Sequence, residues 1–168
     1  MTAKSVKLYT LNYSEMRTYM FATLFIVGNL VLPQLCHLMP QGGLTWLPIY
    51  FFTLVAAYKY GWKVGLLTAL ASPIVNNLLF AMPAAAMLPI ILTKSLLIVA
   101  AASVATKIFK SFNILTVAAV VIAYQLVGAV IEWGMTASLA AAIQDLTIGL
   151  PGIALQIIGG YLVIRKLA

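Results

Sequence analysis

Two charged residues, Lys94 and Glu132, lie well inside long apolar runs of the sequence. A charged side chain in hydrocarbon is costly alone, so such residues usually pair with one another or mark a functional site. We therefore expect Lys94 and Glu132 to form a pair, which either is purely structural or also holds a ligand. Gln125 precedes Glu132 by seven residues, or two helical turns, and shares its helix face.

Polar residues also recur at helical spacing in the first apolar run. Asn29, Pro33 and His37 follow one another at intervals of four, which places them on one face of a helix. Asn29 suits a hydrogen bond to a neighbouring helix. His37 suits either such a bond or contact with a ligand. A metal site made by Cys36 and His37 is disfavoured, because neighbouring residues on a helix point apart and other ligands are few.

The third apolar run carries a second polar face. Thr68, Ser72 and Asn76 share this face, and Asn77 stands beside it. Pro73 removes a backbone hydrogen bond inside the helix. The pattern predicts either a kinked helix that lines a pocket or a structural kink stabilised by Ser and Asn.

Small residues mark the last apolar run, where Gly149, Gly152, Gly159 and Gly160 occur together. Such residues let helices approach closely, so they indicate packing. Gln156 lies on the face of Gly152 and is expected either to join this packing or to face a cavity.

The sequence contains none of the common catalytic motifs. It has no GxxxxGK[ST], HExxH or GxSxG pattern. With one His, three acidic residues and one Cys in all, a hydrolytic site or a multi-ligand metal site is hard to build. We therefore expect neither an enzyme nor a bound cofactor, and any ATP hydrolysis must come from another chain.

The composition is that of a membrane protein. Of the 168 residues, 64% are hydrophobic and 8% are charged, and the mean hydropathy is +1.07. A soluble domain carries about 25% charged residues. The formal charge of +7 does not indicate nucleic-acid binding, because the basic residues fall in short groups between apolar runs. We expect an all-α integral membrane protein that forms one compact bundle.

Six apolar runs separated by polar or turn-forming segments predict six transmembrane helices in a single membrane domain, 1–168. The expected spans are about 18–38, 44–58, 61–82, 84–106, 114–138 and 147–164. Residues 1–17 are expected at the cytoplasmic interface. Apolar residues there recur every three or four positions, which fits either a helix lying on the membrane or an extension of the first span.

The basic residues also predict the orientation. With the N-terminus inside, all but one of them fall in inner segments, and the exception, Lys94, lies within a span. The inner residues are Lys4, Lys7, Arg17, Lys59, Lys63, Lys107, Lys110, Arg165 and Lys166. By the positive-inside rule both chain ends are cytoplasmic.

Three stretches of the sequence resemble a known family, the substrate-binding S components of energy-coupling factor (ECF) vitamin transporters. The first runs from Leu47-Pro48-Ile49-Tyr50 through Tyr60-Gly61-Trp62-Lys63-Val64-Gly65. The second is Ser72-Pro73 followed by Asn76 and Met82-Pro83, and the third is Ile148-Gly149-Leu150-Pro151-Gly152 with Gln156. Together with the expected spans, they cover most of residues 30–160.

This resemblance implies a six-helix bundle in a bacterial or archaeal cell membrane that binds a vitamin or related small molecule from outside. It also implies three partner chains, namely a membrane T component and two cytoplasmic ATPases. The alternative is a structural membrane protein of similar shape, such as a cell-shape scaffold subunit. A small membrane enzyme is disfavoured because no catalytic set is present.

The ligand is expected in the outer half, between the first loop and the third to sixth spans. Trp46 and Trp133 suit either stacking on a ligand ring or anchoring at the interface. The expected binding residues are Gln34, His37, Gln41, Trp46, Asn76, Asn77, Lys94, Gln125, Glu132, Trp133, Gln144 and Gln156.

Overall fold

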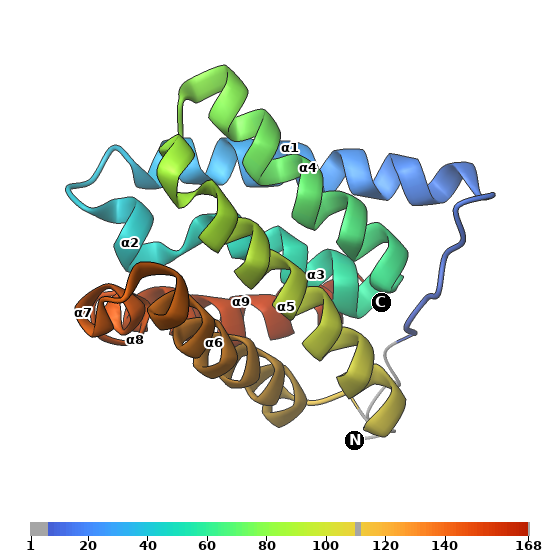
Figure 1. Ribbon diagram of the computed structural model, residues 1–168. Coiled ribbons are helices and arrows are strands. Elements are labelled where there is room, and N and C mark those ends of the chain that lie inside the picture. Colours follow the sequence, from blue (N-terminus) through green and yellow to red (C-terminus); the bar gives the residue numbers. More distant parts are fainter. Residues whose placement is uncertain (1–6, 110–111, 168) are drawn as a thin grey trace.

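Every regular element in the described part of the chain, residues 7–109 and 112–167, is a helix in this computed structural model. The helices pack side by side as a bundle, with short helices gathered at one end (Figure 1). The elements are α1 (Met16–Cys36), α2 (Gly42–Trp46), η1 (Pro48–Tyr50), α3 (Phe51–Tyr60), α4 (Trp62–Phe80), η2 (Ala85–Met87), α5 (Leu88–Ile108), α6 (Ile114–Thr136), α7 (Leu139–Ala142), α8 (Gln144–Thr147) and α9 (Leu150–Lys166). The expected all-α class is confirmed.

Four segments are long and apolar enough to cross a membrane: α1, α4, α6 and Ala85–Ile108, which contains α5. They indicate a membrane-embedded protein. In contrast, α3 has 10 residues and α9 has 17. These helices are only about 15 and 25 Å long, against a hydrocarbon core of about 30 Å. The number of six spans, which depends on α3 and α9, stays a prediction.

The prediction that residues 44–58 form a single helix is wrong. The helix is interrupted at Leu47, which has a positive φ of 47°, and η1 begins at Pro48. Proline lacks an N–H and disfavours helical backbone at the residue before it, which explains the break. The predicted spans 18–38, 61–82, 84–106, 114–138 and 147–164 agree with α1, α4, α5, α6 and α9 to within four residues at each end.

The short helix α3 occupies the centre of the bundle. It packs against α1, α4, α5 and α9, and its residues from Thr53 to Tyr60 are all buried. Gly65 of α4 allows a close approach to α3, since a Cβ there would lie 2.5 Å from the Cβ of Ala57. The four neighbours of α3 therefore shield it from lipid.

Asn29 of α1 ties three helices together. Its Nδ2 donates to Thr53 Oγ1 at 3.0 Å and to Ser72 Oγ at 3.1 Å, while its Oδ1 accepts from the backbone N–H of Phe52 at 3.2 Å. The expected helix-to-helix hydrogen bonding by Asn29 is confirmed. Ser72 serves this bond, so the polar face of α4 is structural at that turn.

The N-terminal residues in the described part of the chain are not helical, unlike the helix that their spacing predicts. The backbone N–H groups of Tyr9 and Leu11 donate to the carbonyls of Lys59 and Tyr60 at 2.8 and 3.2 Å. These carbonyls belong to the last residues of α3, and Gly61, which follows the helix, has a φ of 96°. Residues 7–12 thus run as a strap across the end of α3, and their N–H groups satisfy carbonyls that a helix end leaves open.

The basic residues of the described chain gather at this end of the bundle, except Lys94. Tyr9 lies close to Trp62 and Lys107 in one surface hollow and to Arg17 and Leu167 in another. The short helices α2, α7 and α8 lie at the opposite end (Figure 1). Lys4 and Lys110, also predicted as inner residues, lie outside the described residues. The grouping of basic segments on which the predicted orientation depends is therefore present.

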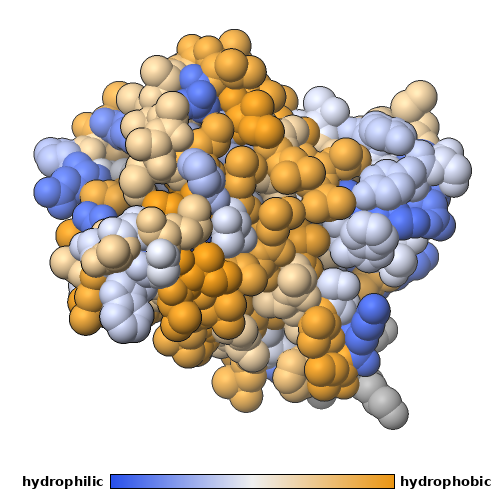
Figure 2. Space-filling view, in the orientation of Figure 1, coloured by the Kyte–Doolittle hydropathy of each residue, from blue (hydrophilic) through white to orange (hydrophobic). Residues whose placement is uncertain are grey.

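Between the two ends the surface is apolar. Figure 2 shows hydrophobic residues across the middle of the visible face and hydrophilic ones toward its two sides. Large side chains such as Leu24, Leu78, Leu115 and Val130 are more than half exposed. A surface of this kind is suited to lipid rather than to water.

Candidate binding site

A groove of about 610 Å³ opens at the end that carries the short helices. It lies between the loop after α1 and the connection from α4 to α5. Its walls are mostly apolar and comprise Pro33, His37–Leu44, Pro48, Ile49, Asn76, Met82–Ala84, Met87 and Ile91. The volume falls in the range of small-molecule sites, which are about 300–1,000 Å³.

Glycines allow the loop after α1 to fold back over the groove. A Cβ at Gly42 would lie 1.8 Å from the carbonyl oxygen of Cys36, and one at Gly43 would lie 2.9 Å from the His37 ring. His37 Nδ1 lies 2.7 Å from the Pro33 carbonyl oxygen. In the neutral ring, Nε2 is an acceptor when Nδ1 donates to that carbonyl. His37 therefore makes a structural bond and also lines the groove.

Three amides from α1 and α4 shape the groove from the side of the bundle. Asn76 is 1% exposed, and its Oδ1 accepts a hydrogen bond from Gln34 Nε2 at 3.2 Å. Asn77 Nδ2 donates to the Pro83 carbonyl at 2.7 Å and so braces the connection from α4 to α5. The structure thus brings Gln34, His37, Gln41 and Asn76 together, with Asn77 in a supporting position.

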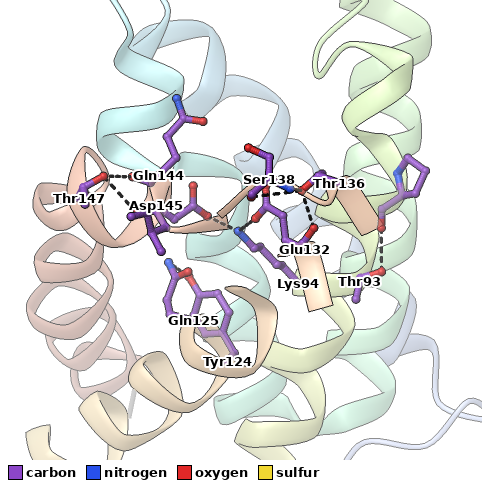
Figure 3. A network of polar contacts seen from close by, with 12 residues as sticks. Thr93, Lys94, Tyr124, Gln125, Glu132, Thr136, Ser138, Gln144, Asp145 and Thr147 are labelled. Atoms are coloured by element: carbon purple, nitrogen blue, oxygen red, sulfur yellow. Dashed lines mark hydrogen bonds and ion pairs between the residues drawn. The ribbon is translucent and has the colours of Figure 1, made fainter. Parts of the chain in front are cut away.

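Lys94, Glu132 and Asp145 form a buried charged cluster (Figure 3). Lys94 Nζ lies 2.5 Å from Glu132 Oε2 and 2.7 Å from Asp145 Oδ2. The contact with Asp145 is a directed hydrogen bond, whereas the contact with Glu132 is close but lacks hydrogen-bond direction. The expected pairing of Lys94 with Glu132 is present, and a third member joins it.

Sequence reasoning missed Asp145. The residue sits in α8, in the loop between α6 and α9, where a polar pair with Gln144 predicts only a turn. A signal was available, because the chain has three acidic residues in all and Asp145 lies close after Glu132. A buried lysine beside a single carboxylate leaves donors unused, which favours a second acceptor nearby.

A chain of hydrogen bonds runs from α6 to α9 beside the charged cluster. Gln125 Nε2 donates to the Tyr124 hydroxyl at 3.1 Å, and this hydroxyl donates to Gln156 Oε1 at 2.5 Å. Gln156 Nε2 in turn donates to the Leu47 carbonyl at 3.4 Å, at the break before η1. The buried Gln125 Oε1 has no donor among the described residues. Gln156 therefore serves the packing of α9, while Gln125 keeps an open acceptor.

The groove and the charged cluster adjoin each other through η1 and α5. Pro48 and Ile49 line the groove, while the next residue, Tyr50, packs on Tyr124 with ring centroids 5.8 Å apart. Ile91 also lines the groove and precedes Lys94 by one helical turn. The site predicted as one pocket is thus a groove beside a buried polar region.

Three expected binding residues lie elsewhere. Trp133 is 52% exposed on the outside of α6, which fits an interfacial anchor better than a ligand contact. Trp46 does not line the groove, and its backbone packs against α9, since a Cβ at Gly152 would lie 2.5 Å from its carbonyl carbon. Gln144 extends away from the Lys94 ammonium (Figure 3).

Comparison with family models, with curated proteins and with solved structures finds no match to this chain. The functional argument therefore depends on the residues and geometry described above.

Proposed function

We propose that this chain is the substrate-binding subunit of an ECF-type importer and that it captures a small organic molecule in the groove. The observation that carries the proposal is the groove itself, about 610 Å³ in volume. It has apolar walls, and His37, Asn76 and the charged cluster lie along it or next to it. Apolar walls with a few convergent polar groups are typical of small-molecule sites.

The position of the groove supports capture from outside the cell. The described basic residues other than Lys94 lie at the opposite end of the bundle. By the positive-inside rule that end is cytoplasmic, so the groove opens outward. Gln41 and the start of α2, Gly42–Leu44, then lie on the outer side and contact the incoming molecule.

Energy for import comes from other chains in this proposal. The sequence carries no phosphate-binding loop. The partners that the family resemblance implies are a membrane T component and two cytoplasmic ATPases. The bilayer is then crossed six times, with α2, η1 and α3 together forming the second crossing and α9 the sixth.

Mass spectrometry of the small molecules that co-purify with the protein tests this function. We expect one organic molecule, present in the parent protein and reduced by about tenfold in the Asn76→Ala variant. The variant Thr93→Val is the control, since Thr93 sits on α5 and its Oγ1 bonds only to the Pro89 carbonyl within its own helix. If only lipid and detergent co-purify and no small molecule binds saturably, the chain is a structural membrane protein.

A further inference from the structure

The charged cluster has more negative than positive groups. Lys94 is its only cation, and it faces both Glu132 and Asp145. In the described chain the remaining Lys and Arg side chains belong to the opposite end of the bundle, and Lys4 and Lys110 are not described. The third acidic residue, Glu15, accepts from the Asn12 N–H instead. With all three groups ionised, the cluster carries one net negative charge.

The cluster also has more acceptors than donors. Among the described residues, Lys94 is the one side chain that forms an ion pair or hydrogen bond with either carboxylate group. Gln125 lies on the α6 face that carries Glu132, and its buried Oε1 has no donor among the described residues. Gly128, between these two on the same face, leaves the space that the Lys94 stem fills, since a Cβ there would lie 3.0 Å from Lys94 Cγ. The open amide oxygen is thus part of the same polar region as the carboxylates.

Buried acceptors and negative charge of this kind favour a ligand group that supplies N–H donors and positive charge. A ligand that carried a carboxylate or phosphate would meet the side chains of Glu132 and Asp145 and the open amide oxygen of Gln125. Like charges at close range oppose binding. The α5 face that borders the groove at Ile91 continues to Lys94 one turn later. Lys94, Glu132 and Asp145 do not themselves line the groove. A molecule seated there approaches the cluster at Ile91, one helical turn from Lys94.

We infer that the molecule held in the groove is a small organic cation, with a protonated amine directed at Glu132 and Asp145 and an apolar body along the groove. The inference rests on the proposed function and gives its substrate class. Asp145 is the carboxylate best placed to contact the incoming amine, because its side chain is 13% exposed, against 6% for Glu132.

Three probes with the same body and different charge test this inference on the full chain in lipid nanodiscs. They are phenethylamine, phenethyl alcohol and phenylacetate, and their affinities are measured by calorimetry at neutral pH. We expect phenethylamine to bind about tenfold or more tightly than either of the other two. This comparison on the parent protein needs no variant, so it does not depend on the folding of a mutant.

The variant Asp145→Asn then tests whether the charged cluster causes the preference for phenethylamine. It keeps the shape and an acceptor oxygen and removes one negative charge, so the advantage of phenethylamine over phenethyl alcohol should fall to about threefold or less. Thr93→Val, next to Lys94 on α5, should keep the full advantage.

The possible failures are distinguishable. If phenylacetate or phenethyl alcohol binds the parent as tightly as the amine, the cation inference is wrong and the groove remains a binding site. If Asp145→Asn keeps the full advantage for the amine, the carboxylates do not select the ligand. If none of the three probes binds saturably up to roughly 10 mM, where fragment-sized ligands are detected, the cation inference is wrong, and the co-purification experiment decides the proposed function separately.

Discussion

Lys94 of α5 lies directly across Gly128 of α6, where a Cβ would come within 3.0 Å of Lys94 Cγ and 3.3 Å of its Cε. Both carboxylates hold the end of this lysine, so its stem cannot swing aside without breaking an ion pair. We predict that Gly128→Val lowers the melting temperature by several degrees, equivalent to about 1–3 kcal/mol of overpacking.

Gly134 provides the matched control for this prediction on the same helix. A Cβ there would meet nothing within 4 Å, so Gly134→Val should leave the melting temperature within about one or two degrees of the parent. Equal melting temperatures for the two valine variants would show that Gly128 does not make room for Lys94.

The charge balance of the cluster should also affect the stability of the protein. Lys94→Met removes the only cation and leaves two buried carboxylates facing each other, which costs about 3–5 kcal/mol when a buried charge loses its partner. We expect a large drop in melting temperature and poor monodispersity in size-exclusion chromatography.

Neutralising Glu132 and Asp145 as well should restore much of the melting temperature that Lys94→Met loses. The triple variant Lys94→Met, Glu132→Gln, Asp145→Asn has no net buried charge, and apolar or neutral replacements of buried ion pairs are often well tolerated. Recovery of at least half of the lost melting temperature is the expected result. A triple variant no more stable than Lys94→Met would mean that packing, not charge, is what Lys94 supplies.

In the groove, Asn76 should contribute to ligand affinity. Its side chain lines the groove and accepts from Gln34, so Asn76→Ala removes a polar contact and should weaken binding of the co-purifying molecule about tenfold, or 1.4 kcal/mol. Isothermal titration together with a melting curve separates this loss from misfolding. Unchanged affinity in a folded variant would place the ligand away from α4.

The binding experiment on Asn76→Ala needs a control variant that changes neither affinity nor stability. A substitution at Thr116 would not serve, although this residue is remote from the groove. Its Oγ1 accepts from the Tyr58 hydroxyl at 3.0 Å, and with Asn113 it forms the capping box of α6. Loss of such a cap costs about 1 kcal/mol. Thr93→Val disturbs only a bond within α5 and is the better control.

Topology is testable by cysteine labelling in intact cells after Cys36→Ala removes the natural thiol. Cysteine at Gln41 should react with an impermeant reagent from outside, whereas cysteine at Lys63 or Lys166 should react only after the cells are opened. Opposite sides for Gln41 and Lys63 would establish that the chain crosses through α2, η1 and α3. Reaction of all three positions from the same side would contradict the six-span arrangement. Lys110, another predicted inner position, is less useful because it lies outside the described residues.

Much of the helical arrangement was predictable because lipid imposes simple rules on sequence. Long apolar runs gave α1, α4, α5 and α6, and the cost of a lone buried charge predicted that Lys94 and Glu132 meet. The same cost did not reveal Asp145, because a carboxylate in a loop has no penalty until the fold brings it inside. The break at Leu47 was missed because the run 44–58 is apolar throughout except Thr45, Thr53 and the proline that causes the break.

The groove was less predictable than the helices. His37 and Asn76 lie on polar faces that helical spacing could identify, and both line it. Trp46, Trp133 and Gln144 were expected on the basis of residue type and loop position alone, and these do not determine which way a side chain points. The loop after α1 folds back through backbone contacts at Gly42 and Gly43, which depend on tertiary structure rather than on any periodic pattern.

The strap formed by residues 7–12 imposes an order on synthesis. Tyr9 and Leu11 are synthesised before the carbonyls that they bind, which belong to Lys59 and Tyr60, about fifty residues later in the chain. At a synthesis rate of about 5–20 residues per second, the strap waits for seconds until α3 is made. Its closure therefore follows the synthesis of α3 and joins residues 7–12 to the end of that central helix.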